Sequence, residues 1–316
     1  MVEMELYPLK FGPIFKERVW GGCRLAEVFG KKLPAGRHIG ESWELSDMPG
    51  EQTVIVNGPL TGQTIGQVVG RFGAEITGKR IEGAFPLLIK LLDIKESLSV
   101  QVHPDQRACE RMGKGQPKSE CWYIIDALPG AVMYRGLKAG TTKERFARAV
   151  ADGTCAEYLE KADVRAGGSC FLPAGTCHSA LGGLLIAEIQ QPSDTTYRVF
   201  DWSRVDPFTG KGRALHIADA LESINFGLPA DKLPAVGGCI ECEAFSVEAL
   251  GGSVGERMAL DAGAMKAIVF ISGAGKICGG CGDAVRFIAG DTILIPAVFE
   301  GFIEFERDCE FLVVRI

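Results

Sequence analysis

Short apolar or alternating runs, bounded by glycine, proline, aspartate and asparagine, are the dominant pattern along this chain. Such runs are typical of antiparallel strands in a sandwich or a barrel, and most of them are too short to be stable alone. The pattern therefore predicts a mainly β protein, with strands at residues 53–56, 87–92, 97–103, 120–125, 131–135, 168–172, 184–190, 245–250, 267–272, 291–295 and 310–315.

Two stretches have the composition of helices inserted between strands. Residues 142–160 are rich in Ala, Glu, Lys and Arg, and Thr141 with Glu144 has the spacing of a capping box at its start. We expect Gly153 to divide this helix into two pieces, because glycine weakens a helix interior. A second helix is expected at 217–224.

The segment 227–238 contains several Pro and Gly residues and is the best candidate for a linker in this chain of 316 residues. We therefore expect a domain at 1–226, with a helical insert near 141–160, and a second β domain at 239–316. The second domain has no obvious chemistry of its own, and we expect it to cover edge strands of the first.

A weak internal repeat connects the two expected domains. GGSCFLPA begins at Gly167 and GDTILIPA begins at Gly290, and both have glycine, five residues, proline and alanine. This match indicates two copies of one strand–turn–strand unit. Five residues after its proline the first copy has His178, where the second has Gly301, so only the first could bind a metal through this turn.

The charge and the apolar runs exclude several classes of protein. The formal net charge is −6, with basic residues mixed among acidic ones, so we expect no nucleic-acid partner. The longest apolar runs, 85–92 and 267–271, fall far short of the roughly 20 residues that a membrane helix needs. The first residues have no signal-peptide pattern, so we expect a cytoplasmic protein without membrane contact.

The 11 cysteines are scattered over a large chain, which favours reduced thiols over a disulfide framework. Two CxxC pairs, Cys239 with Cys242 and Cys278 with Cys281, leave two interpretations open. They could form a second metal site or a redox pair, although their separation of 35 residues exceeds that of zinc ribbons. Incidental thiols in a cysteine-rich chain are the favoured interpretation.

The strand expected at 97–103 combines an apolar face with a polar one. Because side chains alternate along a strand, Ser99, Gln101 and His103 point to the same side. Taken alone, this is also the pattern of a solvated strand face. Two other histidines of the chain, His38 and His216, lie in no comparable setting. We expect them to be structural or exposed.

The next polar strand places Lys118, Glu120 and Trp122 on a common face by the same alternation. A solvated Lys–Glu pair would give the same pattern. His178 follows a Pro- and Gly-containing turn that could direct its imidazole inward from the rim of a barrel. Two histidines and one carboxylate, His103, His178 and Glu120, suit zinc with an open position, and iron or manganese would also fit.

Four long motifs stand out along the chain: FPLLIKLLDIKESLSVQVHPD (85–105), KSECWY (118–123), GSCFLPAGTCHSALGG (168–183) and IAEIQQPSDTTYRVFDWSR (186–204). Their order and spacing resemble those of type I phosphomannose isomerases, the zinc-dependent cupin enzymes that act on mannose 6-phosphate. The shorter WGG at 20–22 and ESWELS at 41–46 are similar to the same family, and the match extends from about residue 7 to 205.

The resemblance implies two cupin-like β-barrel or jelly-roll units with short helical inserts, as in the short bacterial members that lack a large helical domain. It implies one zinc ion per chain, bound by His103, Glu120 and His178, with Gln101 as a further ligand or near neighbour. It also marks Arg198 as catalytic. Beyond residue 230 only the general strand pattern is similar to the family.

The implied reaction interconverts mannose 6-phosphate and fructose 6-phosphate through an enediol, which requires a proton carrier. Three candidates remain open: Glu188, which shares a strand face with Gln190; a zinc-bound water; and Lys118, if burial lowers its pKa. Glu188 could instead be a structural carboxylate paired with Arg198 or Arg204. Arg198 is expected to stabilise the charge that develops in the transition state.

The sugar phosphate needs charge-assisted donors. Ser99, Lys118, Lys90 and Arg198 are the candidates, with Ser42 as a weaker one. Lys90 lies in an otherwise apolar run, so it needs either a buried partner or a route to solvent at a strand edge.

Two other functions remain compatible with the sequence. One is a non-catalytic cupin that binds a phosphosugar, and the other is an isomerase acting on another phosphosugar. The presence of His103, Glu120, His178 and Arg198 favours an enzyme. The oligomeric state cannot be read from the sequence.

Overall fold

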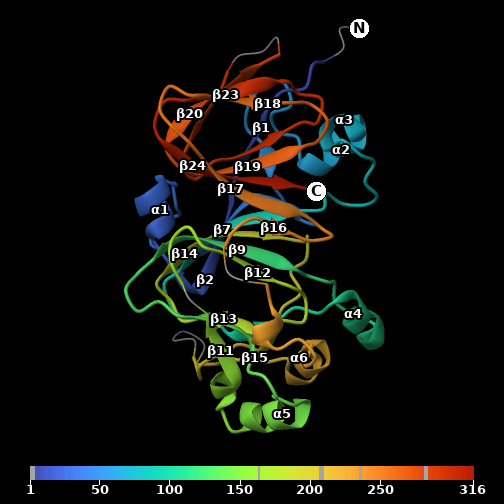
Figure 1. The fold of residues 1–316 in the computed structure, drawn as a ribbon, viewed down its shortest axis with the longest axis vertical. Helices are drawn as coiled ribbons and strands as arrows, with labels where there is room; N and C mark the ends of the chain where they lie inside the picture. Colours follow the sequence, from blue (N-terminus) through green and yellow to red (C-terminus); the bar gives the residue numbers. More distant parts are fainter. Residues whose placement is uncertain (1–3, 163, 206–209, 235–236, 281–283) are drawn as a thin grey trace.

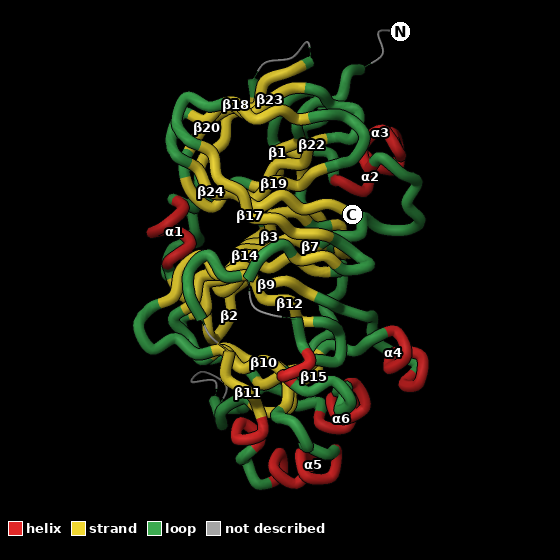
Figure 2. The backbone as a smooth tube through the Cα atoms, in the orientation of Figure 1, coloured by secondary structure: helices red, strands yellow, loops and turns green. Residues whose placement is uncertain are grey.

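The computed structural model describes residues 4–162, 164–205, 210–234, 237–280 and 284–316. Four larger antiparallel sheets are stacked along the long axis of the molecule, with three of the six α-helices at the lower end (Figures 1 and 2). This arrangement confirms the mainly β expectation. All the predicted strands occur, each to within three residues at either end.

The six-stranded sheet lies in the middle of the stack and is buried on both faces. Every residue of its strands β3, β7 and β14 is buried, because one face packs on the seven-stranded sheet and the other faces the five-stranded sheet. In spatial order its strands are β12 (Ser169–Leu172), β9 (Glu120–Ala127), β14 (Leu184–Gln190), β7 (Leu88–Ile94), β3 (Ile39–Leu45) and β2 (Ile14–Gly22).

The five-stranded sheet lies below it and is covered on its far face by helices α5 (Lys143–Ala151) and α6 (Ile217–Ser223). Val100, Val102 and Phe146 belong to the apolar core between this sheet and the helices. The strands, in spatial order, are β11 (Leu159–Ala162), β10 (Met133–Leu137), β13 (His178–Ala180), β8 (Val100–Val102) and β15 (Tyr197–Phe200).

The helix expected at 142–160 is divided near Gly153 as predicted, into α5 and the 3₁₀-helix η1 (Cys155–Tyr158). Its start differs by one residue from the expectation. The side chain of Thr142, not Thr141, caps α5 by accepting a hydrogen bond from the Arg145 amide at 3.3 Å. Five short helices were not predicted, although α2 begins with a capping box formed by Thr64 and Gln67. They are α1 (Arg24–Phe29), α2 (Ile65–Phe72), α3 (Ala74–Thr77), α4 (Gln106–Met112) and η2 (Ala230–Lys232).

The upper part of the molecule consists of the seven-stranded and four-stranded sheets, which enclose a second apolar core. The seven-stranded sheet has the order β16 (Ile240–Glu241), β17 (Ser246–Gly252), β24 (Cys309–Arg315), β19 (Lys266–Ser272), β22 (Thr292–Ile295), β1 (Leu9–Gly12), β6 (Val54–Ile55). The four-stranded sheet has the order β18 (Arg257–Leu260), β23 (Gly301–Phe305), β20 (Ala274–Gly279), β21 (Val285–Ile288), and β4 (Asp47–Met48) pairs separately with β5 (Glu51–Gln52).

Strand β1 connects the two ends of the chain, because Leu9 pairs with Leu294 of β22. Two N-terminal strands, β1 and β6, therefore complete a sheet that is otherwise C-terminal. The division into 1–226 and 239–316 stays a prediction, and these two strands would cross it.

The two segments of the internal repeat have the same local structure. In each, a four-residue strand is followed by a turn in which the proline carbonyl accepts a hydrogen bond from the amide three residues later, at 3.0 Å. The next strand then begins at His178 in one copy and at Gly301 in the other. The turn therefore leads into a strand that begins with a histidine in the first copy alone.

Gly167 and Gly290, the first residues of the two copies, provide a stability test. Both have positive φ, 81° and 86°, which disfavours any side chain. A Cβ at Gly290 would also lie 2.7 Å from Phe29, whereas nothing lies within 4 Å of a Cβ at Gly167. We expect Gly167→Ala to cost about 1–2 kcal/mol and Gly290→Ala about 1–3 kcal/mol more, measured by urea unfolding. Equal losses would contradict the assigned contact with Phe29.

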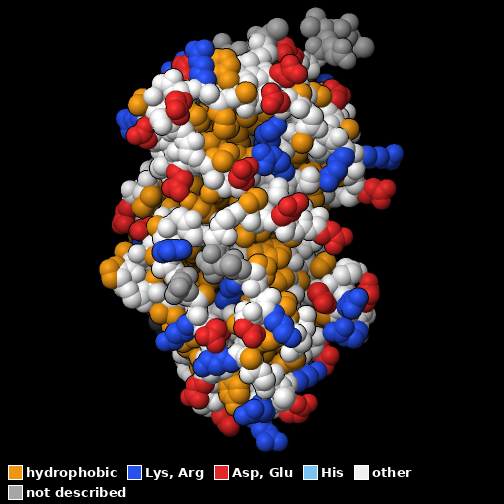
Figure 3. Space-filling model, in the orientation of Figure 1, with side chains coloured by type: hydrophobic (Ala, Val, Ile, Leu, Met, Phe, Trp, Pro, Cys, Tyr) orange, Lys and Arg blue, Asp and Glu red, His pale blue; other side chains and the backbone are white. Residues whose placement is uncertain are grey.

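The surface agrees with the mixed charge pattern of the sequence. On the face shown in Figure 3, acidic and basic side chains are interspersed. None of the helices in the described ranges is long and apolar enough to cross a membrane.

Candidate active site

A cavity of about 590 Å³ lies between the six-stranded and five-stranded sheets. Most of its lining side chains are polar or charged, although the rest of the space between the two sheets is filled by apolar residues. They are Glu17, Arg18, Val19, Trp20, Glu41, Lys90, Leu92, Leu98, Ser99, Gln101, Lys118, Trp122, Glu188, Asp194, Thr196, Arg198, Arg213 and His216.

Next to this cavity, His103, Glu120 and His178 form a buried group whose ligand atoms all lie within 4.8 Å of one another. His103 follows β8, Glu120 begins β9 and His178 begins β13, so both sheets contribute. The Nε2 atoms of His103 and His178 lie 3.4 and 3.2 Å from the two oxygens of Glu120. The structure thus brings together the three residues that the sequence predicted as metal ligands.

Both imidazole rings are oriented by backbone carbonyls. His103 Nδ1 donates to the Thr195 carbonyl at 2.8 Å and His178 Nδ1 donates to the Thr176 carbonyl at 2.9 Å, because a carbonyl oxygen can only accept. Each Nε2 atom therefore carries the lone pair and faces Glu120, as in metal-binding histidines. Burial and the nearby Lys118 ammonium lower the pKa of His103 to about 4, so its ring is neutral at neutral pH.

The ligand atoms themselves are poorly satisfied. His103 Nε2 and both Glu120 oxygens are buried and have no well-aligned hydrogen-bond partner among the described residues. Leaving a buried carboxylate and an imidazole in this state is costly, whereas a divalent cation would satisfy all three atoms. Two imidazoles and one carboxylate are a donor set that suits zinc. The described part of the chain contains no other group that could hold a metal in this way.

Lys118 and Gln101 adjoin the candidate ligands, as strand alternation predicted. Lys118 Nζ lies 2.9 Å from Glu120 Oε2. The Gln101 amide nitrogen lies 3.3 Å from His178 Nε2, and the amide oxygen accepts a hydrogen bond from Ser99 at 3.2 Å. Gln101 is therefore close enough to be a further ligand or a neighbour of the ligands.

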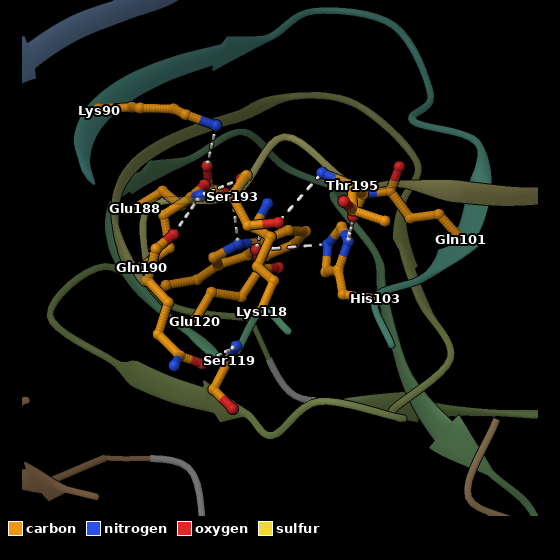
Figure 4. Close-up of polar contacts among 12 residues, drawn as sticks. Lys90, Gln101, His103, Lys118, Ser119, Glu120, Glu188, Gln190, Ser193 and Thr195 are labelled. Atoms are coloured by element: carbon orange, nitrogen blue, oxygen red, sulfur yellow. Dashed lines mark hydrogen bonds and ion pairs between the residues drawn. The ribbon is translucent and has the colours of Figure 1, made fainter. Parts of the chain in front are cut away.

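Glu188 lines the cavity and, in the view of Figure 4, lies beside Lys90 and apart from His103. Its Oε2 atom pairs with Lys90 Nζ at 2.8 Å, and its Oε1 atom accepts a hydrogen bond from the Trp122 indole at 3.0 Å. The alternative partners considered from the sequence, Arg198 and Arg204, were wrong. Lys90 is directly opposite Glu188 in the register of β7 and β14, which no reading of either strand alone could show.

Three guanidinium groups line another part of the cavity. Arg18 pairs with Glu41 at 2.7 Å, and Arg213 pairs with Asp201 through two hydrogen bonds. Arg198 Nε has no hydrogen-bond partner among the described residues. Burial, followed by the charges of Arg213 and Arg18, lowers the pKa of Arg198, although a guanidinium remains charged. The sequence indicated Arg198 but neither Arg18 nor Arg213, which carry no local signal.

Two sequence-based expectations were wrong. Ser42 lies outside the cavity lining and donates its hydroxyl to Glu44, because its position on β3 faces the apolar core, away from the cavity. His216 lines the cavity, and its Nδ1 atom accepts a hydrogen bond from the Arg198 amide at 3.3 Å. His38 is exposed, as expected.

The second candidate metal site is only partly visible. Cys239 is exposed, and Cys242 and Cys278 are half-buried. Cys281 lies outside the described residues. A site formed by both CxxC pairs therefore stays a prediction.

Comparison with known proteins places this geometry in one family. Residues 8–126 match the model of the phosphomannose isomerase type I catalytic domain. The chain is 36% identical to a probable mannose-6-phosphate isomerase of Bacillus subtilis over 97% of its own length and 98% of the relative. It is 39% identical to a mannose-6-phosphate isomerase of Streptococcus mutans over 72% of its own length and 71% of that protein.

A solved structure supports the same assignment. The crystal structure of mannose 6-phosphate isomerase from Bacillus subtilis superposes with a TM-score of 0.84 at 31% identity, covering 98% of this chain and 99% of that one. The similarity therefore extends over both ends of the chain, including the upper sheets that contain none of the candidate ligands. This chain belongs to the type I phosphomannose isomerase family.

Proposed function

We propose that this protein interconverts mannose 6-phosphate and fructose 6-phosphate and that it requires one zinc ion per chain. The observation that carries the proposal is the buried His103–Glu120–His178 group, whose ligand atoms converge beside a charged cavity. His103 Nε2 and the Glu120 oxygens have no well-aligned hydrogen bond among the described residues, although Lys118 lies 2.9 Å from one Glu120 oxygen. Membership of the family supports the choice of substrate.

We also infer that the fold consists of two cupin-like units, which correspond to residues 1–226 and 239–316 with 227–238 as the linker. The identical strand–turn–strand structure that precedes His178 and Gly301 supports this duplication. The two N-terminal strands β1 and β6 would then be exchanged into the sheet of the second unit.

His103, Glu120 and His178 would hold the zinc ion, and Gln101 is the residue best placed to act as a fourth ligand. The amide of Gln101 would have to turn its oxygen toward the ligands, and its nitrogen could then donate to Ser99. When bound, zinc would supply Lewis-acid polarisation of the sugar carbonyl. Its charge would also acidify the adjacent C–H group.

The protein's own residues would move the proton. In the open-chain sugar, a base takes the proton from C2 and returns it to C1, while the O2 hydroxyl proton passes to O1, so an aldose becomes a ketose through an enediol. Glu188 is our first candidate for this base because it is a buried carboxylate on the cavity wall. Lys118 and a metal-bound water remain the alternatives, and Arg198 would stabilise the enediolate charge.

The phosphate would bind where the guanidinium groups converge. Arg198, Ser99 and Lys118 all line the cavity, as expected for substrate ligands. Arg18 and Arg213, each also paired with a carboxylate, add two further guanidinium donors that the sequence did not reveal. Charge-assisted hydrogen bonds from guanidinium groups are well suited to a phosphate dianion.

The direct test is to incubate the purified protein with mannose 6-phosphate and to follow fructose 6-phosphate, with and without a chelator. We expect conversion that the chelator abolishes and added zinc restores. Absence of conversion, or conversion that is indifferent to the chelator, would contradict the proposal. Calorimetric binding without conversion would indicate a non-catalytic phosphosugar-binding protein, and turnover of a different phosphosugar would reassign the substrate.

A further inference from the structure

A row of four charges, three of them buried, crosses the six-stranded sheet on the cavity side. Arg18 on β2, Glu41 on β3, Lys90 on β7 and Glu188 on β14 follow one another in space and alternate in sign. Glu41 Oε1 pairs with Arg18 at 2.7 Å, and Glu41 Oε2 lies 3.9 Å from Lys90 Nζ. Lys90 Nζ then lies 2.8 Å from Glu188 Oε2.

Two buried indoles hold this row in place. The Trp43 indole donates to Glu41 at 2.7 Å, and the Lys90 ammonium lies 5.3 Å from the centre of the Trp43 ring. The Trp122 indole donates to the second oxygen of Glu188 at 3.0 Å. Both oxygens of Glu188 are therefore engaged, and the orientation of its carboxylate is set from two sides.

Lys90 is consequently a poor ligand for an anionic substrate. Its side chain is 5% exposed, and its ammonium lies between the carboxylates of Glu188 and Glu41. With Arg18, which pairs with Glu41, the row has two positive and two negative charges, so the charge of Lys90 is already balanced. Burial opposes the charged form of Lys90, but the two carboxylates outweigh this effect and raise its pKa. A phosphate dianion would be attracted to Arg198 rather than here.

We infer that Lys90 is a positioning residue that aims the Glu188 carboxylate into the cavity, and that Glu41 holds Lys90 in this place. The inference rests on the proposed function, because it assigns Glu188 a role in the isomerisation. Neither Lys90 nor Glu41 would touch the reacting atoms. Both would act only through Glu188.

The inference is tested by a double-mutant cycle with Lys90→Met, Glu188→Gln and the double variant, assayed with mannose 6-phosphate. We expect Lys90→Met to lower kcat about 30–100-fold with a KM change below about 3-fold, because the base is mispositioned and unpaired. In the Glu188→Gln background, Lys90→Met should lower kcat by less than about 3-fold more, because the two residues act as a unit. Losses that multiply would overturn the inference.

A calorimetric titration with mannose 6-phosphate tests the same inference through binding, without depending on turnover. If Lys90 positions Glu188, Lys90→Met should change Kd by less than about 3-fold. A loss of at least about 30-fold would identify Lys90 as a substrate ligand and contradict us. Absence of turnover in the wild-type protein would contradict the proposed isomerase, whereas this titration would still decide the role of Lys90.

Lys276→Met is the matched control, because Lys276 also pairs with a carboxylate, Glu304 at 2.7 Å, across neighbouring strands of the distant four-stranded sheet. It should leave kcat and KM unchanged. If Lys90→Met does not fold, as urea unfolding would show, Glu41→Gln replaces it in the cycle. That variant retains the Lys90–Glu188 pair, and we expect a kcat loss of about 5–10-fold that disappears in the Glu188→Gln background.

Discussion

Replacing Glu120 by glutamine should abolish metal binding and lower turnover at least ~1000-fold, since a Lewis-acid metal contributes several kcal/mol to the transition state. Glu120 supplies the negative charge of the candidate centre, and its two oxygens lie 3.4 and 3.2 Å from the Nε2 atoms of His103 and His178. Glutamine has nearly the same shape but no charge, so the change removes the negative charge of the candidate centre without creating a cavity. The measurements are metal content after dialysis and kcat with mannose 6-phosphate.

Glu110→Gln is a suitable control for Glu120→Gln. Glu110 is an exposed residue of helix α4, and the same substitution there should leave the metal content and kcat unchanged. About one zinc per wild-type chain, absent from Glu120→Gln, would also exclude a second tightly bound metal, including one at the CxxC pairs. Glu120→Gln protein that retains its metal and most of its turnover would show that the centre lies elsewhere.

Replacing Glu188 by glutamine should lower kcat at least ~100-fold while the metal content stays at the wild-type level. The carboxylate is 4% exposed, lines the cavity and does not belong to the group of metal ligands. The amide can still contact Lys90 and Trp122, but it cannot accept a proton from carbon. The measurements are kcat, KM and the metal content of the same preparation.

Glu160→Gln, on the exposed edge strand β11, is the matched control and should have normal kinetics. Near-normal turnover of Glu188→Gln would remove Glu188 as the proton carrier and favour Lys118 or a metal-bound water. A loss of metal in Glu188→Gln would mean that the carboxylate supports the centre rather than the proton transfer. The two substitutions therefore separate the metal's contribution from that of the base.

The pattern of the sequence was sufficient wherever the decisive physics is local. Strand alternation placed Gln101 with His103 and Lys118 with Glu120. In the structure Lys118 pairs with Glu120, and Gln101 contacts His178, the other histidine of the same group. The same argument could not place Ser42, because alternation says which residues share a face but not which face is the cavity. The resemblance to a family then supplied the substrate and Arg198, which alternation alone would not have singled out.

The local signals missed two long strands, β2 with nine residues and β3 with seven. Arg18 and Glu41 belong to these strands. The cap of α5 was displaced by one residue, because Thr141 and Thr142 are both good capping residues and only the backbone decides between them. His216 was dismissed because its sequence neighbours are unremarkable, yet the chain returns it to the cavity beside Arg198.

The sequence by itself thus determined the mainly β class, the family and three candidate ligands, since strand period, turn residues and long motifs are all encoded within short stretches. Only the tertiary structure decided which charges meet. Lys90 faces Glu188 because β7 and β14 are neighbouring strands whose register pairs these two residues. Arg18 joins the same row of charges from strand β2, although it precedes Lys90 by more than seventy residues in the chain. Strand order and register depend on the packing of the whole sheet, so no short segment contains them.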